Sequence, residues 1–359
     1  MNTATPTLDR HDRAELQARN AELATAEPRL RIRDRAQRLG VSEAELVAAE
    51  CGLSAVELVA NSERPMQTLF NELGTLGRVM ALSRNDWCVH ERHGSYEDIK
   101  AEGPVGLVLG PDIDLRLFFT CWQHCYAVTD NGRRSIQFFD REGVAVHKVF
   151  LTEHSDEAAY DALVARYAAR GKRQPVIEAI AAGNELPDVA DAAALREAWL
   201  AMTDTHQFFP LLRKFNVARL GALRAAGRDL AQPVASDAVE TMLHSAAASG
   251  LSIMCFVGNR GIVQIHSGPV SKLLRTGPWF NVLDPDFNLH LNTEAIAECW
   301  VVNKPTSDGW VTSLEVYAAD GELIVQWFGE RKPGKPELSG WRDLMVSLCA
   351  TPLAGERLP

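Results

Sequence analysis

Residues 103–117, GPVGLVLGPDIDLRL, return 174 positions later as residues 277–291, GPWFNVLDPDFNLHL. The two stretches share a Gly-Pro pair at the start, a Pro-Asp pair near the middle and two leucines close to the end. Self-similarity at a fixed separation indicates a repeated structural unit. We therefore interpret the chain as a tandem duplication.

The same register extends beyond these stretches. At a separation of 174 the further matches are Val79-Met80 with Ile253-Met254, Asn85 with Asn259, and Gly94 with Gly268. After an insertion of four residues around PTSDGW (305–310), Ser135 and Gly143 match Ser313 and Gly321 at a separation of 178. One alignment thus runs through both halves, and it predicts two similar modules packed together.

Each module is predicted to contain helices followed by an antiparallel meander. Residues 10–60 are rich in Ala, Leu, Glu and Arg, which favours helix, and Pro28 interrupts them. Residues 78–150 carry β-branched and aromatic residues between turn signals, which is typical of strands. Helical segments follow at 156–171 and 194–202. The pattern predicts an α+β fold.

A boundary between the modules is expected near residues 175–190, where Pro175, Gly183 and Pro187 are typical of a linker. The predicted units are therefore an N-terminal repeat, 1–185, and a C-terminal repeat, 186–359.

The charge of the chain limits its partners. With 359 residues, 46% of them hydrophobic, the chain is long enough for two ordinary domains. The formal net charge of -10 argues against nucleic acid and anionic membrane surfaces as partners, because both would be repelled. No apolar stretch reaches membrane-spanning length, and the opening residues lack a signal-peptide pattern, so we predict a cytoplasmic protein with no membrane insertion.

The cysteines and histidines give no strong metal signal. Seven scattered cysteines predict buried, reduced thiols rather than a disulfide framework. In Cys121-Trp-Gln-His124-Cys125 the histidine and the last cysteine would point to opposite faces of a strand, which disfavours a closed zinc site. His90 and His93 are likewise an odd number of residues apart.

The two halves differ where a ligand would bind. Arg116 corresponds to His290, whereas His206, Lys304 and Arg331 have no counterpart of the same type at these separations. A ligand site formed by residues of both halves would therefore occur once per chain.

His206 precedes an amphipathic helix that we predict to begin near Pro210 and to end at Gly227. The positive end of a helix favours the neutral, metal-binding form of imidazole. The residues alone leave two interpretations open, a metal ligand and a capping or packed histidine.

Three segments, 110–119, 203–224 and 300–334, resemble the HemS/ChuS/PhuS family, also called hemin-degrading factors. The resemblance covers residues 30 to 350 approximately, together with the duplicated layout. It implies two large antiparallel sheets stacked centrally with helices at the ends. It also implies haem b (iron protoporphyrin IX) as the cofactor.

The resemblance assigns roles to individual residues. His206 stands where the family has its iron ligand, and Arg116 stands where it has a distal arginine, which is also the candidate catalytic residue. The remaining assignments are the propionate contacts Arg219, Lys304, Gln326 and Arg331 and the pocket walls Phe118, Phe256 and Phe328. Phe328 stands where some relatives have tyrosine, so a hydroxyl contact to propionate would be missing.

Three functions remain open at this stage. The chain could carry haem from an importer to a separate haem oxygenase, or open the ring itself with an external electron donor. Both functions need an axial histidine, a distal polar group and an apolar pocket. A third hypothesis is a non-haem interaction protein that has kept the fold.

Overall fold

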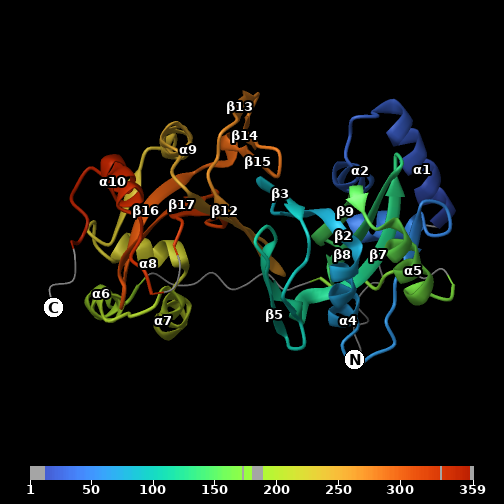
Figure 1. The fold of residues 1–359 in the computed structure, drawn as a ribbon, viewed down its shortest axis with the longest axis horizontal. Helices are drawn as coiled ribbons and strands as arrows, with labels where there is room; N and C mark the ends of the chain where they lie inside the picture. Colours follow the sequence, from blue (N-terminus) through green and yellow to red (C-terminus); the bar gives the residue numbers. More distant parts are fainter. Residues whose placement is uncertain (1–12, 172–173, 180–188, 332–333, 356–359) are drawn as a thin grey trace, which may run out of the picture.

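The computed structural model describes residues 13–171, 174–179, 189–331 and 334–355. It contains two nine-stranded antiparallel sheets in the middle of the molecule, with helices gathered at the two ends (Figure 1). The predicted α+β class, with two large antiparallel sheets flanked by helices, is confirmed.

Each sheet combines six strands of one half with three strands of the other. The first sheet has the order β1 (Ala55–Glu57), β7 (Trp122–Asp130), β8 (Arg133–Asp140), β9 (Ala145–Ser155), β2 (Gly77–Arg84), β3 (Cys88–Gly94), β15 (Phe287–Asn292), β14 (Trp279–Leu283), β13 (Leu273–Thr276). The second has the order β10 (Ala231–Val234), β16 (Glu298–Thr306), β17 (Gly309–Tyr317), β18 (Leu323–Gly329), β11 (Ile253–Gly258), β12 (Ile262–Gly268), β6 (Asp114–Phe118), β5 (Val105–Leu109), β4 (Ile99–Lys100). Equivalent strands follow the same order in the two sheets, and each sheet takes strands from both halves of the chain.

Two matched asparagines join the halves reciprocally. The Asn85 side-chain amide donates to the backbone oxygens of Gly258 and Ile324 at 3.2 and 2.7 Å. The Asn259 amide donates to the oxygens of Arg84 and Val146, both at 2.9 Å. The acceptors are themselves equivalent, since Arg84 precedes Gly258 by 174 residues and Val146 precedes Ile324 by 178. The two halves therefore meet symmetrically.

The described residues form five helices in each half of the chain. Figure 1 shows these helices towards the two ends of the molecule. Those of the first half are α1 (Arg13–Ala26), α2 (Ile32–Leu39), α3 (Glu43–Ala49), α4 (Pro65–Asn71) and α5 (Glu157–Tyr167). Those of the second are α6 (Ala192–Leu200), α7 (Phe208–Phe215), α8 (Arg219–Ala225), α9 (Ala238–Ser249) and α10 (Ser339–Leu348). Short 3-10 turns are η1 (Glu72–Leu76), η2 (Phe119–Cys121), η3 (Thr205–Gln207) and η4 (Thr293–Ala295). The predicted helical region 10–60 thus holds three helices in its described part and ends in the short strand β1.

The predicted single helix from Pro210 to Gly227 is wrong. It is two helices, because Asn216 adopts a left-handed conformation (φ 48°, ψ 49°) that ends α7. Asparagine tolerates this conformation better than most residues and commonly ends helices in this way. In the first half Gly40 ends α2 in the same manner, 176 residues earlier. The pair α7 and α8 therefore repeats the pair α2 and α3.

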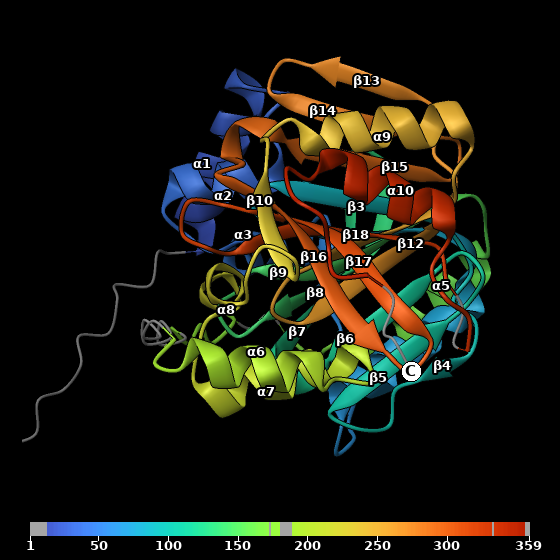
Figure 2. The same cartoon turned by 90° about the vertical axis from the view of Figure 1, so that its left-hand side faces the viewer.

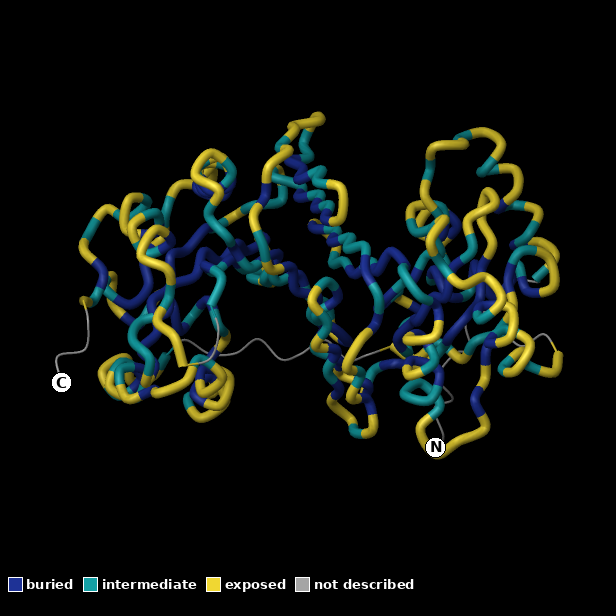
Figure 3. The backbone as a smooth tube through the Cα atoms, in the orientation of Figure 1, coloured by how far each residue is buried: buried dark blue, intermediate teal, exposed yellow. Residues whose placement is uncertain are grey.

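The second sheet has helices on both faces. Figure 2 shows β16 and β17 passing between α6, α7 and α8 on one side and α9 and α10 on the other. The helices α9 and α10 pack on a core that includes Val301, Leu314 and Trp327. The helices α6, α7 and α8 pack on Val302 and Tyr317. Figure 3 shows the buried residues mainly in the interior of the molecule and the exposed residues mainly on its outer segments.

The other expectations have mixed outcomes. No disulfide joins any of the seven cysteines, all of which lie in the described part of the chain; five are buried, and Cys121 and Cys349 are partly exposed. The linker residues Gly183 and Pro187 lie outside the described part of the chain. Within the described part, no helix is long and apolar enough to cross a membrane. There, too, no three His, Cys, Asp or Glu side chains gather as a metal-binding group.

Candidate functional site

Most of the predicted site residues lie on one face of the second sheet. Side chains directly opposite each other on antiparallel strands point to the same face. Gln326 is opposite both Glu315 on β17 and Phe256 on β11. Val263 is opposite both Gly258 on β11 and Arg116 on β6. By this register and the alternation along each strand, the face carries Lys304, Glu315, Gln326, Phe328, Phe256, Arg116 and Phe118.

Helices cover only part of this face. The buried ring of Phe208, at the start of α7, lies 4.7 Å from Lys304 Nζ and 5.1 Å from the guanidinium carbon of Arg219. Towards β11 and β6 the face is more open. Phe256 and Phe328 are half-buried and meet edge to face, with ring centroids 5.1 Å apart, whereas Phe118 is 36% exposed. An apolar surface therefore continues from α7 towards β6.

His206 stands beside this face on the short turn η3. Asp204 accepts hydrogen bonds from the His206 backbone N–H at 2.8 Å and from Nδ1 at 2.6 Å. The backbone bond is the main reason that the pKa of Asp204 is lowered. The imidazole is 93% exposed. Because the carboxylate holds Nδ1 as the donor, Nε2 is the nitrogen left for a metal, an arrangement common among metal-binding histidines.

The turn that carries His206 is fixed to the second sheet. The Ser307 backbone N–H, in the hairpin between β16 and β17, donates to the Thr203 oxygen at 2.8 Å. The Trp199 indole donates to the Asn303 oxygen at 3.1 Å. These bonds place His206 at the end of the strand pair that carries Lys304 and Glu315.

A buried carboxylate, Glu315, organises three of the four predicted propionate contacts. Arg219 donates to it twice, through Nε and Nη2, each at 2.7 Å. Lys304 and Gln326 donate to its Oε1 at 3.0 and 2.7 Å. The hydroxyls of Ser313 and Tyr317 donate at 2.9 and 2.5 Å. Sequence reasoning did not find Glu315.

The charges of this cluster stabilise one another. Burial alone would raise the pKa of Glu315, but Arg219 and Lys304 hold it well below its usual range. Burial lowers the pKa of Lys304 to about 8, although Glu315 opposes that shift. Burial also acts to lower the pKa of Arg219, but Glu315 outweighs it and the pKa is raised. The cluster is therefore an ion network that contains one lysine with a lowered pKa.

Arg331, the fourth predicted propionate contact, stands apart from Glu315. Its Nη2 lies 3.4 Å from an oxygen of Asp308, which is a long hydrogen bond. Its Nε is buried and has no hydrogen-bond partner among the described residues. A buried donor without an acceptor is costly, and an incoming oxygen would satisfy it.

Arg116 pairs with Asp114 on the same strand and also donates to the Leu115 oxygen at 3.2 Å. Its side chain is 34% exposed. An ion pair as exposed as this contributes at most about 1 kcal/mol, so the guanidinium can exchange Asp114 for another partner at low cost.

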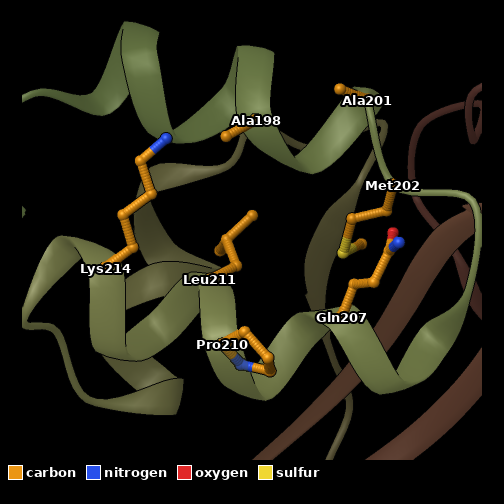
Figure 4. Close-up of a pocket in the computed structure, with 7 residues that line it drawn as sticks. All are labelled: Ala198, Ala201, Met202, Gln207, Pro210, Leu211 and Lys214. Atoms are coloured by element: carbon orange, nitrogen blue, oxygen red, sulfur yellow. The ribbon is translucent and has the colours of Figure 1, made fainter.

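A separate hollow of about 220 Å³ lies between α6 and α7 (Figure 4). Its walls include Ala198, Met202, Leu211 and Lys214. None of the predicted site residues lines it, and it is smaller than the 300–1,000 Å³ typical of ligand pockets. The open sheet face is therefore the better candidate site.

Most of this chain matches a known protein family. The model of the haemin-degrading HemS.ChuX domain matches residues 40–167 and 216–348. The chain belongs to this family. The hemin transport protein HmuS of Yersinia pestis is 41% identical over 90% of this chain and 94% of its own.

Two solved structures in the HemS family have the same overall fold. Holo-PhuS, a heme-binding protein from Pseudomonas aeruginosa, is 48% identical and superposes with a TM-score of 0.91, covering 95% of this chain and all of its own. The heme degrading enzyme ChuS of Escherichia coli O157:H7 is 38% identical, with a TM-score of 0.88 over 94% of this chain and all of its own.

In the first half of the chain, the positions equivalent to the candidate site carry other residue types. The separation of 176 residues that relates the helices places Glu43 where the second half has Arg219 and Leu30 where it has His206. At 178, Gln137 takes the place of Glu315. The matched pair Ser135 and Ser313 is thus the sequence signal that could have pointed to Glu315, two residues further on.

Proposed function

We propose that this chain binds one haem b per molecule, between the turn before α7 and the open face of the second sheet. His206 would ligate the iron through Nε2, and Arg116 would serve as the distal residue. The convergence of the predicted ligand residues from both halves on one sheet face, beside the turn that carries His206, is the observation that supports this proposal most strongly.

The surroundings suit the ligand. Haem is a flat apolar ring with two carboxylates, and ring burial contributes about 25 cal/mol per Å². Apolar surface is supplied by the half-buried rings of Phe256 and Phe328 and by the exposed ring of Phe118. Because the chain carries a net charge of -10, the carboxylates need local cations. Arg219, Lys304 and Arg331, with the amide of Gln326, would meet that need.

The chain's own residues would control the bound iron. Haem supplies the redox and oxygen chemistry when it is bound. Asp204 fixes the His206 ring by accepting from Nδ1 and makes Nε2 a better donor to the metal. Arg116 could exchange Asp114 for a polar group bound at the iron and donate a hydrogen bond to it, and this role would make Arg116 the candidate catalytic residue.

We infer that the biological role is cytoplasmic haem trafficking, haem breakdown to release iron, or both. One relative is named a hemin transport protein, another a heme-binding protein and a third a heme degrading enzyme. A carrier would need a haem importer and a separate haem oxygenase as partners, whereas an enzyme would need an external electron donor. A non-haem interaction protein is the alternative if His206 proves to be structural.

Titration of the purified chain with haem, followed at the Soret band, tests the proposal. Only the second half carries His206 and the buried cations, so saturation at one equivalent is expected. Two equivalents of equal affinity, or no saturable binding, would refute it. Adding a reductant to the complex in the presence of catalase then separates the roles. Release of a tetrapyrrole product identifies an enzyme, and an intact Soret band identifies a carrier.

A further inference from the structure

We propose that Glu315 is a positioning residue of the haem site: it holds Arg219, Lys304 and Gln326 in one cluster that accepts a single carboxylate of the ligand. This inference rests on the proposed function. It concerns a residue that would act through its neighbours and would not itself touch the ligand.

Glu315 uses only part of the donor capacity of its neighbours. Arg219 gives Glu315 its Nε and Nη2, and among the described residues its Nη1 has no hydrogen-bond partner. Lys304 has three N–H donors, and its one hydrogen bond in the described structure goes to Glu315. Gln326 likewise gives one bond from an amide with two donors. Fixing one edge of the guanidinium leaves the other edge oriented for a further oxygen.

The charge of the cluster matches one carboxylate. Two cations, Arg219 and Lys304, face one anion, Glu315, and the other members are neutral. The result is one uncompensated positive charge in a site where Lys304 is 3% and Glu315 0% exposed. A buried net charge is unfavourable until an anion arrives. A single propionate would neutralise the cluster, whereas loss of Glu315 would leave the buried Lys304 and the half-buried Arg219 without their anion.

The first half shows that the fold itself does not require a carboxylate here. Gln137 occupies the equivalent position and donates to Ser135 at 3.0 Å. Glu43, the counterpart of Arg219, pairs with Lys148, the counterpart of Gln326. These equivalent residues in the first half are thus an ion pair, Glu43 with Lys148, and the neutral amide of Gln137. They lie in the half that lacks His206. A carboxylate at this position therefore occurs in the half that carries the proposed ligand site and is absent from the equivalent position of the other half.

Glu315→Gln tests the inference when haem is compared with haem dimethyl ester, whose propionates carry no charge. A charge-assisted hydrogen bond contributes about 1.5 to 3 kcal/mol, so wild type should prefer haem over the ester by about tenfold or more. Glu315→Gln should lose most of that preference while binding the ester as wild type does. A purely structural defect would weaken the binding of haem and of the ester equally, and this result would overturn the inference. A wild-type protein that does not prefer haem over the ester would overturn it too.

A second variant separates the position of the donors from the charge of the cluster. Glu315→Gln combined with Lys304→Met is compared with Lys304→Met alone, because the double variant has one more positive charge but lacks the carboxylate that holds Arg219 and Gln326. A weaker preference for haem in the double variant than in Lys304→Met is expected, and an equal or stronger preference would overturn the inference.

Glu337→Gln is the matched control, because Glu337 is a buried carboxylate of the same half that binds Thr312 and Arg342 instead. It should leave the preference unchanged. If wild type fails to bind haem at all, the proposed function fails, whereas unchanged preferences in both Glu315 variants would refute only the role of Glu315.

Discussion

The buried lysine of the cluster makes haem affinity depend on pH in a defined direction. Burial lowers the pKa of Lys304 to about 8 in the free protein. The charged or titratable groups around it are Glu315, which favours its protonated form, and Arg219, which opposes it, with the neutral Tyr317 hydroxyl on the same carboxylate. A propionate beside Lys304 would favour the protonated form further, so its pKa would rise on binding.

The sign follows from linkage. Below pH 8 Lys304 already carries its proton, and affinity should be full and constant as far as this group is concerned. Above pH 8 the free protein loses the proton, and the complex must take it up again. Affinity should therefore fall by up to about tenfold for each pH unit above 8, until the pKa of the complex is reached.

The assay is a haem titration between pH 7 and 9.5, with haem dimethyl ester as a reference that shares the iron and its bound water. Because both ligands carry this water, any pH dependence caused by its ionisation cancels in the ratio of the two affinities. Lys304→Met should bind haem about tenfold or more weakly at pH 7, because it lacks one charge-assisted bond, and its ratio should not change with pH. An unchanging ratio in wild type, or the same slope in Lys304→Met, would refute the reasoning.

Two further predictions concern the distal side and the junction of the halves. Arg116→Ala should leave haem bound but change the spectrum and the pH titration of the ferric water complex, since the guanidinium would no longer bond the iron-bound ligand; an unchanged spectrum and unchanged turnover would remove Arg116 from the site. Asn259→Ala should lower the free energy of unfolding in urea by about 2 kcal/mol, because it removes two hydrogen bonds between the halves, and Asn85→Ala should do the same. A loss in only one of these two variants would contradict the symmetric junction.

The sequence predicted what depends on local pattern. The matched segments 103–117 and 277–291 revealed the duplication. The alternation along a strand predicted that His124 and Cys125 point to opposite faces, and in the structure Cys125 is buried whereas His124 is half-buried. The single helix from Pro210 to Gly227 was wrong because one residue, Asn216, takes a left-handed conformation that the helical periodicity does not reveal.

The exchange of strands between the halves could not be predicted from the residues. Strand β6 of the first half pairs with β12 of the second half, and this pairing depends on tertiary packing, which the local sequence pattern does not reveal. Glu315 was missed for a related reason. An acidic residue in a strand is ordinarily expected to be solvated. The partners of Glu315 come from the consecutive strands β16, β17 and β18 and from α8, which lies about 80 residues earlier in the chain and reaches Glu315 only in the folded structure.

Iron ligation by His206 is the central claim, and resonance Raman spectroscopy of the ferrous haem complex measures it most directly. Protein labelled with ¹⁵N-histidine should show an isotope shift of the iron–histidine stretching band, and His206→Ala should lose the band and bind haem more weakly without losing it altogether. His244→Ala, an exposed histidine on α9 at the opposite face of the second sheet, is the control and should keep the wild-type spectrum. A wild-type band and wild-type affinity in His206→Ala would contradict the account.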